Sequence, residues 1–452
     1  MVSFRRLCTV WLPLALNALA APRRHGAAPR HGAAPRHGGD AAPAPPAPPV
    51  ALICGTAALQ SACFGCIGTA LPPALRASGL APARVAVVLG RIGSASALAE
   101  VAFSGTFGRV ADAVGRKPLL LGAPAVTIAA RAAVVARPDV RVLVFARLVS
   151  AFAVPVYWLA FQASLADAYG RDARRLAVVG SRVQAAMGFG YAVASLAGGA
   201  LAARDVRLAY AASSLVGCCV LACVAATPET LPDGRRRPFR GGLGVDPLAF
   251  VGLFSRGAAM ARLNVVVLCQ SLTNGMGDLW QVLARELRDW GAAQCGRFAA
   301  AAGLSSMLGV LLTGPSIRRL GPRGHTVATT AASAGASALL GRATTDAAAY
   351  AALGPLALGA GKSQATSARI VNLGESLGVP QGRLSAERTA LNAVVKVVAP
   401  TLYANLFALG ARTGRIGLPF YVTAALLVAS AAVAATTPYE AAAEEPPGGT
   451  RT

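Results

Sequence analysis

The chain has 452 residues, of which 55% are hydrophobic and only 14% are charged, and its mean hydropathy is +0.53. A water-soluble protein of this length would need more polar residues to cover its surface, a disordered chain would be far less hydrophobic, and the 49 glycines lack the three-residue period of collagen. The formal net charge of +24 does not indicate a nucleic-acid partner, because the basic residues form short groups between long apolar runs. The composition therefore predicts a protein that lies largely in a lipid bilayer.

The two ends of the chain differ from this apolar middle. Residues 1–20 are typical of a signal or targeting segment, because Arg5 and Arg6 precede a 12-residue apolar stretch that closes on a small-x-small pattern. A membrane anchor is the alternative, although the stretch is shorter than the ~20 residues that span a bilayer. Residues 21–49 repeat Arg-His-Gly-Ala-Ala-Pro and predict a disordered linker, and residues 437–452 predict a disordered acidic tail.

Between these ends, apolar runs recur about every 32 residues, which is enough for one membrane helix and a short loop each time. The sequence therefore predicts an all-α fold with twelve transmembrane helices. Residues 50–226 and 261–436 each supply a six-helix bundle, and residues 227–260 form a central loop. The twelve runs lie at 50–72, 83–104, 118–136, 141–163, 181–202, 207–226, 261–284, 296–314, 324–342, 346–366, 387–409 and 417–436.

The basic residues beside these runs predict the orientation of the chain. The even-numbered loops hold 19 of them and the odd-numbered loops hold 12, so the positive-inside rule places both termini and the central loop on the cytoplasmic side, or on the stromal or matrix side of an organelle. Cleavage of a secretory signal would conflict with that orientation. Either the leader is retained or it directs import into an organelle, and the resident membrane stays open among plasma membrane, endomembrane and organelle.

A ten-residue loop pattern occurs twice. Gly108 and Gly115 follow the second run, Gly314 and Gly321 follow the eighth, and both pairs are separated by the same offset of 206 residues. The final base of the pattern, Lys117, recurs as Arg323 with that offset. The two bundles are therefore predicted to be duplicates, an arrangement in which one half can rock against the other around a site at the midplane.

The first copy resembles the signature loop of the major facilitator superfamily, G-x-x-x-D-x-x-G-R-K/R, at Gly108, Asp112, Gly115, Arg116 and Lys117. The resemblance covers about residues 50 to 436. Three further segments resemble this family, and within it the tetracycline-efflux and drug:proton antiporter branch. They are the Arg147 run in the fourth span, the fifth-helix glycines Gly190, Gly198 and Gly199, and Pro228-Glu229-Thr230 at the end of the sixth span.

The resemblance implies a secondary transporter that moves a small organic solute across the bilayer by alternating access, with proton-coupled efflux as the leading subclass. Two departures argue against proton antiport: the fifth span lacks the usual Gly-Pro pair, and the first span holds no carboxylate. A uniporter or importer is one alternative, and a non-transporting membrane sensor or scaffold is another. We expect a monomer without cofactor or metal.

The repeated loop is the candidate conformational switch. Asp112 beside Arg116 and Lys117 is interpreted as a charge relay on the cytoplasmic face that latches one bundle against the other in one state, while Gly108 and Gly115 permit close approach and a tight turn. The alternative is a solvated loop whose charges only set the topology. Gly314, Gly321 and Arg323 are the corresponding residues of the second copy.

Polar groups inside membrane spans are costly and are therefore candidates for the solute or proton pathway. Arg147 is the first of these, and Glu100 is interpreted as a proton site or as a partner of Arg91 or Arg131. The alternatives are snorkelling, structural ion pairs and interhelical hydrogen bonds, and Lys396 is assigned to the structural class. The remaining candidates are Asp278, Lys362, Gln60, Asn274 and Gln364.

Two patterns with other meanings are rejected. Gly359–Ser363 ends like a phosphate-binding loop, but Leu356 occupies the position of its opening glycine and no strand pattern precedes it. Cys63 and Cys66 have the C-x-x-C spacing without a second pair or a nearby His, so helix packing is the preferred interpretation. No arrangement of catalytic residues is visible, and an enzyme is not expected.

Overall fold

The computed structural model describes residues 48–77, 79–169, 172–231, 236, 248–277 and 279–437. The described residues form helices joined by short connections, and no strand is found among them. The predicted targeting segment 1–20, nearly all of the linker 21–49, most of the central loop and all but the first residue of the tail 437–452 lie outside the described residues, as does Asp278.

The first group of helices follows the six predicted spans of the N-terminal bundle. Helix α2 packs against α7 and α8, α5 packs against α6 and α8, and α4 packs against α6. Pro82 begins α4 in its first turn, where a missing N–H costs nothing, and Gly115 separates α4 from α5. The helices are α2 (Val50–Gly68), α3 (Leu71–Ala77), α4 (Pro82–Val114), α5 (Arg116–Ala136), α6 (Val140–Tyr169), α7 (Ala173–Arg204) and α8 (Val206–Ala226).

The second group begins inside the predicted central loop, whose end forms two short helices. Its seventh and tenth predicted spans are broken into pieces where glycine and proline are frequent, because both residues disfavour a helix interior. The elements are η2 (Ala249–Val251), α9 (Gly252–Ser255), α10 (Ala258–Leu272), η3 (Thr273–Met276), α11 (Leu279–Arg288), α12 (Ala292–Leu311), α13 (Thr313–Arg342), α14 (Asp346–Ala351), α15 (Leu353–Leu358), η4 (Gly359–Gly361), α16 (Gln364–Ser376), α17 (Gln381–Arg412) and α18 (Leu418–Thr436).

Eight helices in the described part of the chain are long and apolar enough to cross a membrane, and nine if the bent pair α12 and α13 counts as one span. That pair bends by 65° at its break. All twelve predicted apolar runs correspond to helical segments, while the number of crossings stays a prediction. Several helices exceed the predicted runs: α4 has 33 residues, or about 50 Å, against a hydrocarbon core of about 30 Å.

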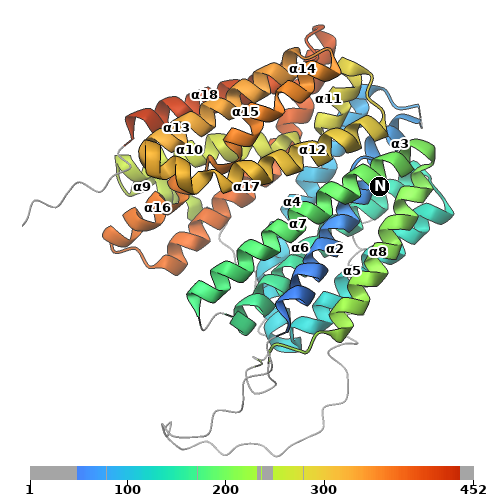
Figure 1. Ribbon diagram of the computed structural model, residues 1–452, viewed down its shortest axis with the longest axis horizontal. Coiled ribbons are helices and arrows are strands. Elements are labelled where there is room, and N and C mark those ends of the chain that lie inside the picture. Colours follow the sequence, from blue (N-terminus) through green and yellow to red (C-terminus); the bar gives the residue numbers. More distant parts are fainter. Residues whose placement is uncertain are drawn as a thin grey trace, which may run out of the picture.

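The two groups of helices are joined at one end and separate at the other (Figure 1). A single apolar core at the joined end contains residues of both groups, such as Leu75, Leu283 and Phe407. At the other end each group has its own core, centred on Tyr157 and Phe161 in the first and on Leu253 and Ile370 in the second. The odd-numbered loops lie at the joined end, so the Arg-rich face is the one at which the halves are apart.

Two helix pairs carry the contact between the halves: α4 with α17 and α7 with α12. In span numbers these are the second with the eleventh and the fifth with the eighth. In a duplicated structure each span of one half corresponds to the span six positions away in the other half. The second span then corresponds to the eighth and the eleventh to the fifth, so the two pairs are equivalent. The loop repeat in the sequence and the packing of the helices therefore point to the same internal symmetry.

Candidate functional site

The first copy of the loop pattern forms a cluster of charges at the separated end. Arg116 is the first residue of α5 and is 8% exposed. Its Nη1 lies 2.6 Å from Asp112 Oδ1 at the end of α4, and its Nε lies 3.0 Å from Asp167 Oδ2 near the end of α6. One guanidinium therefore binds three helices together, and its two short ion pairs satisfy a charge that would be costly to bury alone.

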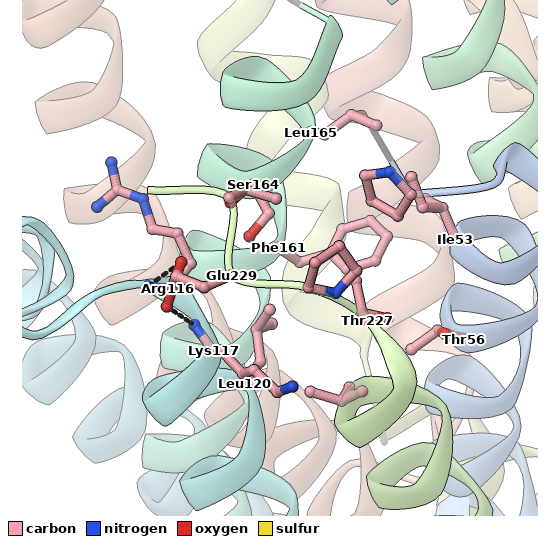
Figure 2. A pocket seen from close by; sticks show the side chains of 14 residues that line it. Ile53, Thr56, Arg116, Lys117, Leu120, Phe161, Ser164, Leu165, Thr227 and Glu229 are labelled. Atoms are coloured by element: carbon pink, nitrogen blue, oxygen red, sulfur yellow. Dashed lines mark hydrogen bonds between the residues drawn. The ribbon is translucent and has the colours of Figure 1, made fainter. Parts of the chain in front are cut away.

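Glu229 forms hydrogen bonds with the start of α5 (Figure 2). Its Oε1 accepts a hydrogen bond from the backbone N–H of Arg116 at 3.1 Å, and its Oε2 accepts one from the backbone N–H of Lys117 at 3.0 Å. These N–H groups have no partner inside the helix, and a carboxylate at a helix N-terminus also interacts favourably with the helix dipole. The segment after α8 is thus fixed to α5, and Lys117 Nζ donates to the carbonyl of Ala225 at 2.7 Å.

Gly115 is required by this geometry. Its φ of +108° and ψ of 171° fall in a region that is essentially restricted to glycine. A Cβ built on Gly115 would lie 2.5 Å from Glu229 Oε2, closer than real Cβ atoms approach other heavy atoms. Any side chain here would therefore strain the backbone and displace the carboxylate. Glu229 was identified in the sequence by resemblance only, because it lies 113 positions from the helix start that it caps.

The latch between bundles is predicted for one conformational state and stays a prediction. The described contacts of Asp112, Arg116 and Lys117 all lie within the first group of helices. A Cβ on Gly108 would meet no described atom within 4 Å, so the expected close approach is also not made here. The reason is that the halves are apart at this end. In this arrangement the cluster braces one half rather than joining two.

The second copy of the pattern keeps the backbone but not the charges. Gly321 has φ +70° and ψ 167°, the same region as Gly115, and α13 bends there. Arg318 stands where the first copy has an acid, and no ion pair of Arg318 or Arg323 is found within the described residues. A Cβ on Gly314 would meet nothing closer than Arg318 Nη1 at 3.9 Å. The duplication is visible in the turn, while the charge cluster belongs to the first copy.

A second charge cluster, not predicted from the sequence, braces the other half. The guanidinium of Arg256, just after α9, forms an ion pair with Glu387 of α17, whose side chain is 4% exposed. Arg383 Nε lies 3.1 Å from Glu387 Oε1. Hydrogen bonding to this carboxylate raises the pKa of the Arg256 guanidinium. The end of the central loop is thereby fixed to the start of α17.

The middle of the molecule holds a third ion pair, and this one joins the halves. Glu100 Oε1 of α4 lies 2.8 Å from Lys396 Nζ of α17. Glu100 is the nineteenth of the 33 residues of α4, and Lys396 is the sixteenth of the 32 residues of α17. The pair therefore lies near the midpoints of both helices.

Two adjoining cavities, of about 340 Å³ and 590 Å³, surround this pair. Both are lined by Glu100, Lys396, Val154 and Pro155. The smaller cavity adds Arg147, Ser150, Ser96 and Phe64, among others, and the larger one adds Phe107, Phe152, Trp158 and Gln162. A separate pocket beside Glu229, lined by Thr56, Ser164 and Thr227 (Figure 2), has about 40 Å³ and is too small for an organic solute.

The structure brings together only some of the predicted pathway residues. Arg147 and Glu100 both line the cavity, but Glu100 pairs with Lys396 rather than with Arg91 or Arg131. Lys396, which the sequence assigns to the structural class, forms this ion pair and also lines the cavity. The other candidates do not line either cavity: Gln60 is buried in α2, Asn274 lies in η3, Lys362 follows η4, and Gln364 begins α16.

The fifth-helix glycines are packing positions. A Cβ on Gly190 would lie 2.2 Å from Ala58 O, and one on Gly198 would lie 2.3 Å from Cys66 O, so both allow α7 to approach α2 closely. Gly199 faces α12 instead, where a Cβ would lie 2.7 Å from Ala292 O. Gly199 therefore belongs to the contact between the halves, at the joined end.

Long apolar helices in two matching groups, with a charged cavity at mid-depth between them, define a multi-pass integral membrane transporter. The chain belongs to the Major Facilitator Superfamily, whose sequence model matches residues 53–400. Membership of this family places the function in transport across a membrane rather than in catalysis.

Three solved structures illustrate the similarity. The human organic anion transporter MFSD10 (TETRAN) is 17% identical, with a TM-score of 0.61 over 85% of this chain and 98% of that chain. The nucleoside transporter NupG is 13% identical, with a TM-score of 0.65 over 85% and 98%. A bacterial homologue of the human lysosomal transporter Spinster, in an inward-facing conformation, is 13% identical, with a TM-score of 0.62 over 85% and 95%. At these identities the likeness concerns the fold alone.

Proposed function

We propose that the chain is a secondary transporter that moves a small organic solute by alternating access, and that Glu100 is the group through which protons are coupled to that movement. The observation that carries this proposal is the Glu100–Lys396 pair. It is an ionisable contact between the two halves, at the midpoints of their helices, on the wall of a cavity large enough for a solute.

The conformation supports alternating access with the cavity facing the Arg-rich side. At the joined end, Arg76 pairs with Glu286 across the halves at 2.9 Å, and Gln281 Nε2 donates to the carbonyl of Gly68 at 2.9 Å. Between this end and the Glu100–Lys396 pair, Ser94 of α4 and Thr401 of α17 share a further hydrogen bond across the halves at 2.7 Å. Opening the joined end would require breaking them, while the other end would close.

Efflux by exchange with protons is the second candidate, favoured by the resemblance of Pro228-Glu229-Thr230 to the drug-exporter branch. Import and uniport are distinguished from it by the response of the flux to a pH gradient. Exchange accelerates when protons move against the solute, co-transport accelerates when they move with it, and uniport responds to neither.

The test is solute flux into proteoliposomes with and without a pH gradient, across several chemical classes of solute. Glu100→Gln should reduce pH-driven flux about tenfold or more, because the variant cannot bind and release a proton. Glu286→Gln is the matched control, since it removes an acid from another ion pair between the halves that lies outside the cavity. If no solute class gives flux, the scaffold interpretation replaces this one; if Glu100→Gln responds to pH like the wild type, Glu100 is not the coupling group.

A further inference from the structure

A separate cavity of about 350 Å³, the aromatic cavity, lies mainly in the second half and shares no lining residue with the two cavities around the Glu100–Lys396 pair. Helix α12 contributes five of its lining residues. Each of them comes 206 residues after a residue of α4 that lines the smaller of those two cavities, and 206 is also the offset of the repeated loop. The five pairs are Ile92 and Phe298, Gly93 and Ala299, Ser96 and Ala302, Ala97 and Gly303, and Glu100 and Ser306.

The other walls of the aromatic cavity follow the same internal symmetry. The smaller cavity beside Glu100 is also lined by α6 of its own half and by Lys396 of α17 from the other half. The aromatic cavity is lined by Leu356 of α15 from its own half and by Tyr191 of α7 from the other. In span numbers, the fourth and eleventh are replaced by the tenth and fifth, each six positions away. A packing defect would have no reason to recur at the equivalent place, so the aromatic cavity is a feature of the duplicated architecture.

The chemistry of the aromatic cavity differs from that of its counterpart. Ser306 stands in place of Glu100, and the described lining holds no ion pair like that of Glu100 with Lys396. The ring of Phe298 lies 5.7 Å from that of Trp280 and 5.2 Å from that of Trp290, between centroids. A lining of this kind favours a flat apolar molecule, which can stack on the rings. The five aromatic side chains that line the cavity are Tyr191, Trp280, Trp290, Phe298 and Phe420.

Arg288, at the end of α11, is the only charged side chain among the described residues that line the aromatic cavity. Its guanidinium lies over the ring of Trp290, with Cζ 5.2 Å from the centroid. The indole N–H of Trp290 donates to Asp346 Oδ1 at 2.5 Å, and this carboxylate also interacts electrostatically with Arg288. Of the five N–H groups of the guanidinium, one donates to the carbonyl of Leu340 and no other has an acceptor among the described residues. The cavity therefore offers hydrogen-bond donors whose charge already has a counter-charge nearby.

We propose that the aromatic cavity is a second ligand site, and that its ligand is an uncharged, planar aromatic molecule bearing a hydrogen-bond acceptor such as a carbonyl oxygen. The aromatic body stacks among Trp280, Trp290 and Phe298, and the acceptor takes a hydrogen bond from Arg288. An anion is disfavoured because the carboxylate of Asp346 already offsets Arg288, and a cation is disfavoured by Arg288 itself. The inference is independent of the proposed function, since it requires neither transport nor Glu100.

The first experiment measures equilibrium binding of radiolabelled 2-naphthamide to the purified full-length chain. The competitors are 2-ethylnaphthalene, which lacks the acceptor, and 2-naphthoate, which is an anion. We expect 2-ethylnaphthalene to compete at least about tenfold more weakly than unlabelled 2-naphthamide, because a hydrogen bond to a charged donor is lost. The naphthoate should compete no better than the amide. In Arg288→Met, 2-naphthamide and 2-ethylnaphthalene should compete equally, a result that a general loosening of the fold would not give.

Two matched variants locate the site. Ala302→Phe fills the aromatic cavity, whereas Ser96→Phe places the same ring at the equivalent position of the first half, which is also half-buried. We expect Ala302→Phe to abolish saturable binding of 2-naphthamide and Ser96→Phe to leave it unchanged. Size-exclusion chromatography of both variants checks that they are folded, and Arg288→Met tests the same site without filling it.

Several results would overturn the inference. They are no saturable binding of 2-naphthamide, equal competition by 2-ethylnaphthalene in the wild type, stronger competition by the naphthoate, unchanged binding in Ala302→Phe, and loss of binding in Ser96→Phe. Each of these is a binding result and is distinct from the flux that tests the proposed function. Binding with this specificity in a chain that gives no flux would refute transport and keep the site, whereas flux without it would keep the transporter and refute the site.

Discussion

Three glycine-to-alanine substitutions in the repeated loop separate the contributions of backbone strain, steric contact and helix propensity. Gly115 and Gly321 occupy the same position of the two copies and the same backbone region, with φ +108° and +70° and ψ 171° and 167°. Placing a side chain there costs about 1–3 kcal/mol. The two sites differ in their surroundings: a Cβ on Gly115 meets Glu229 Oε2 at 2.5 Å, whereas one on Gly321 meets nothing described within 4 Å.

We therefore expect Gly115→Ala to be the more destabilising of the two. Both variants share the backbone strain. Gly115→Ala also loses the carboxylate cap on α5, which lowers the free energy of unfolding by a further ~0.5–2 kcal/mol, the usual contribution of an N-terminal cap. Gly108→Ala lies inside α4 with open space around it and should stabilise the helix by about 0.5–1 kcal/mol. In detergent, the apparent Tm should thus be highest for Gly108→Ala, next for the wild type, lower for Gly321→Ala and lowest for Gly115→Ala.

The assay is thermal unfolding of the purified variants, followed by monodispersity on size-exclusion chromatography. Equal melting of Gly115→Ala and Gly321→Ala would show that the Glu229 contact contributes nothing measurable. Flux measured on Gly108→Ala adds a second readout: a well-folded variant with reduced transport would indicate that Gly108 is approached closely in the other conformation, as the sequence pattern predicts.

Three further outcomes follow from the same contacts. Asp167→Asn should lower the Tm and the flux, because it leaves the buried Arg116 with one ion-pair partner. Asp112→Asn should lower the Tm less, because the Asp112 side chain is 44% exposed. The reverse order of the two Tm values would contradict the burial argument. Gly199→Val should weaken the joined end, where even a Cβ lies 2.7 Å from Ala292 O, and should increase thiol labelling of cysteines introduced between α7 and α12; unchanged labelling would count against this contact. Glu387→Gln should release the end of the central loop and speed its proteolysis near Arg256, whereas Glu375→Gln, an acid without a described ion pair, should not.

The sequence predicts the elements of this fold well because each signal is local. Apolar runs of span length, Pro82 at a helix start and glycine at positions 115 and 321 act within a few residues, and the helices form where these signals predict them. The breaks in the seventh and tenth spans also have local causes, in the Gly-rich segment before residue 278 and around Gly359 and Gly361.

The partners of the charged residues were not predictable in the same way. Glu100 and Lys396 are 296 positions apart, and Arg116 and Glu229 are 113 apart, so their pairing depends on how the helices pack. Helical periodicity gives the face of one helix but not the identity of the helix opposite. Arg131 illustrates the limit: the sequence places it inside the third apolar run but does not show its neighbour, and in the structure it is 1% exposed, with its Nη1 3.5 Å from Ser213 O.

The location of the charge clusters indicates how the molecule divides into moving parts. At the separated end the clusters lie within one half each, around Arg116 in the first and around Glu387 in the second. Contacts between the halves occur at the cavity and at the joined end, where Arg76–Glu286 is 22–27% exposed and surrounded by an apolar core that belongs to both halves. Each half can therefore rotate as a stiff body without losing its buried ion pairs. In the proposed alternating access, the ion pairs that would break are partly hydrated and contribute little free energy. The cost of the transition would therefore fall mainly on the apolar surface at the joined end.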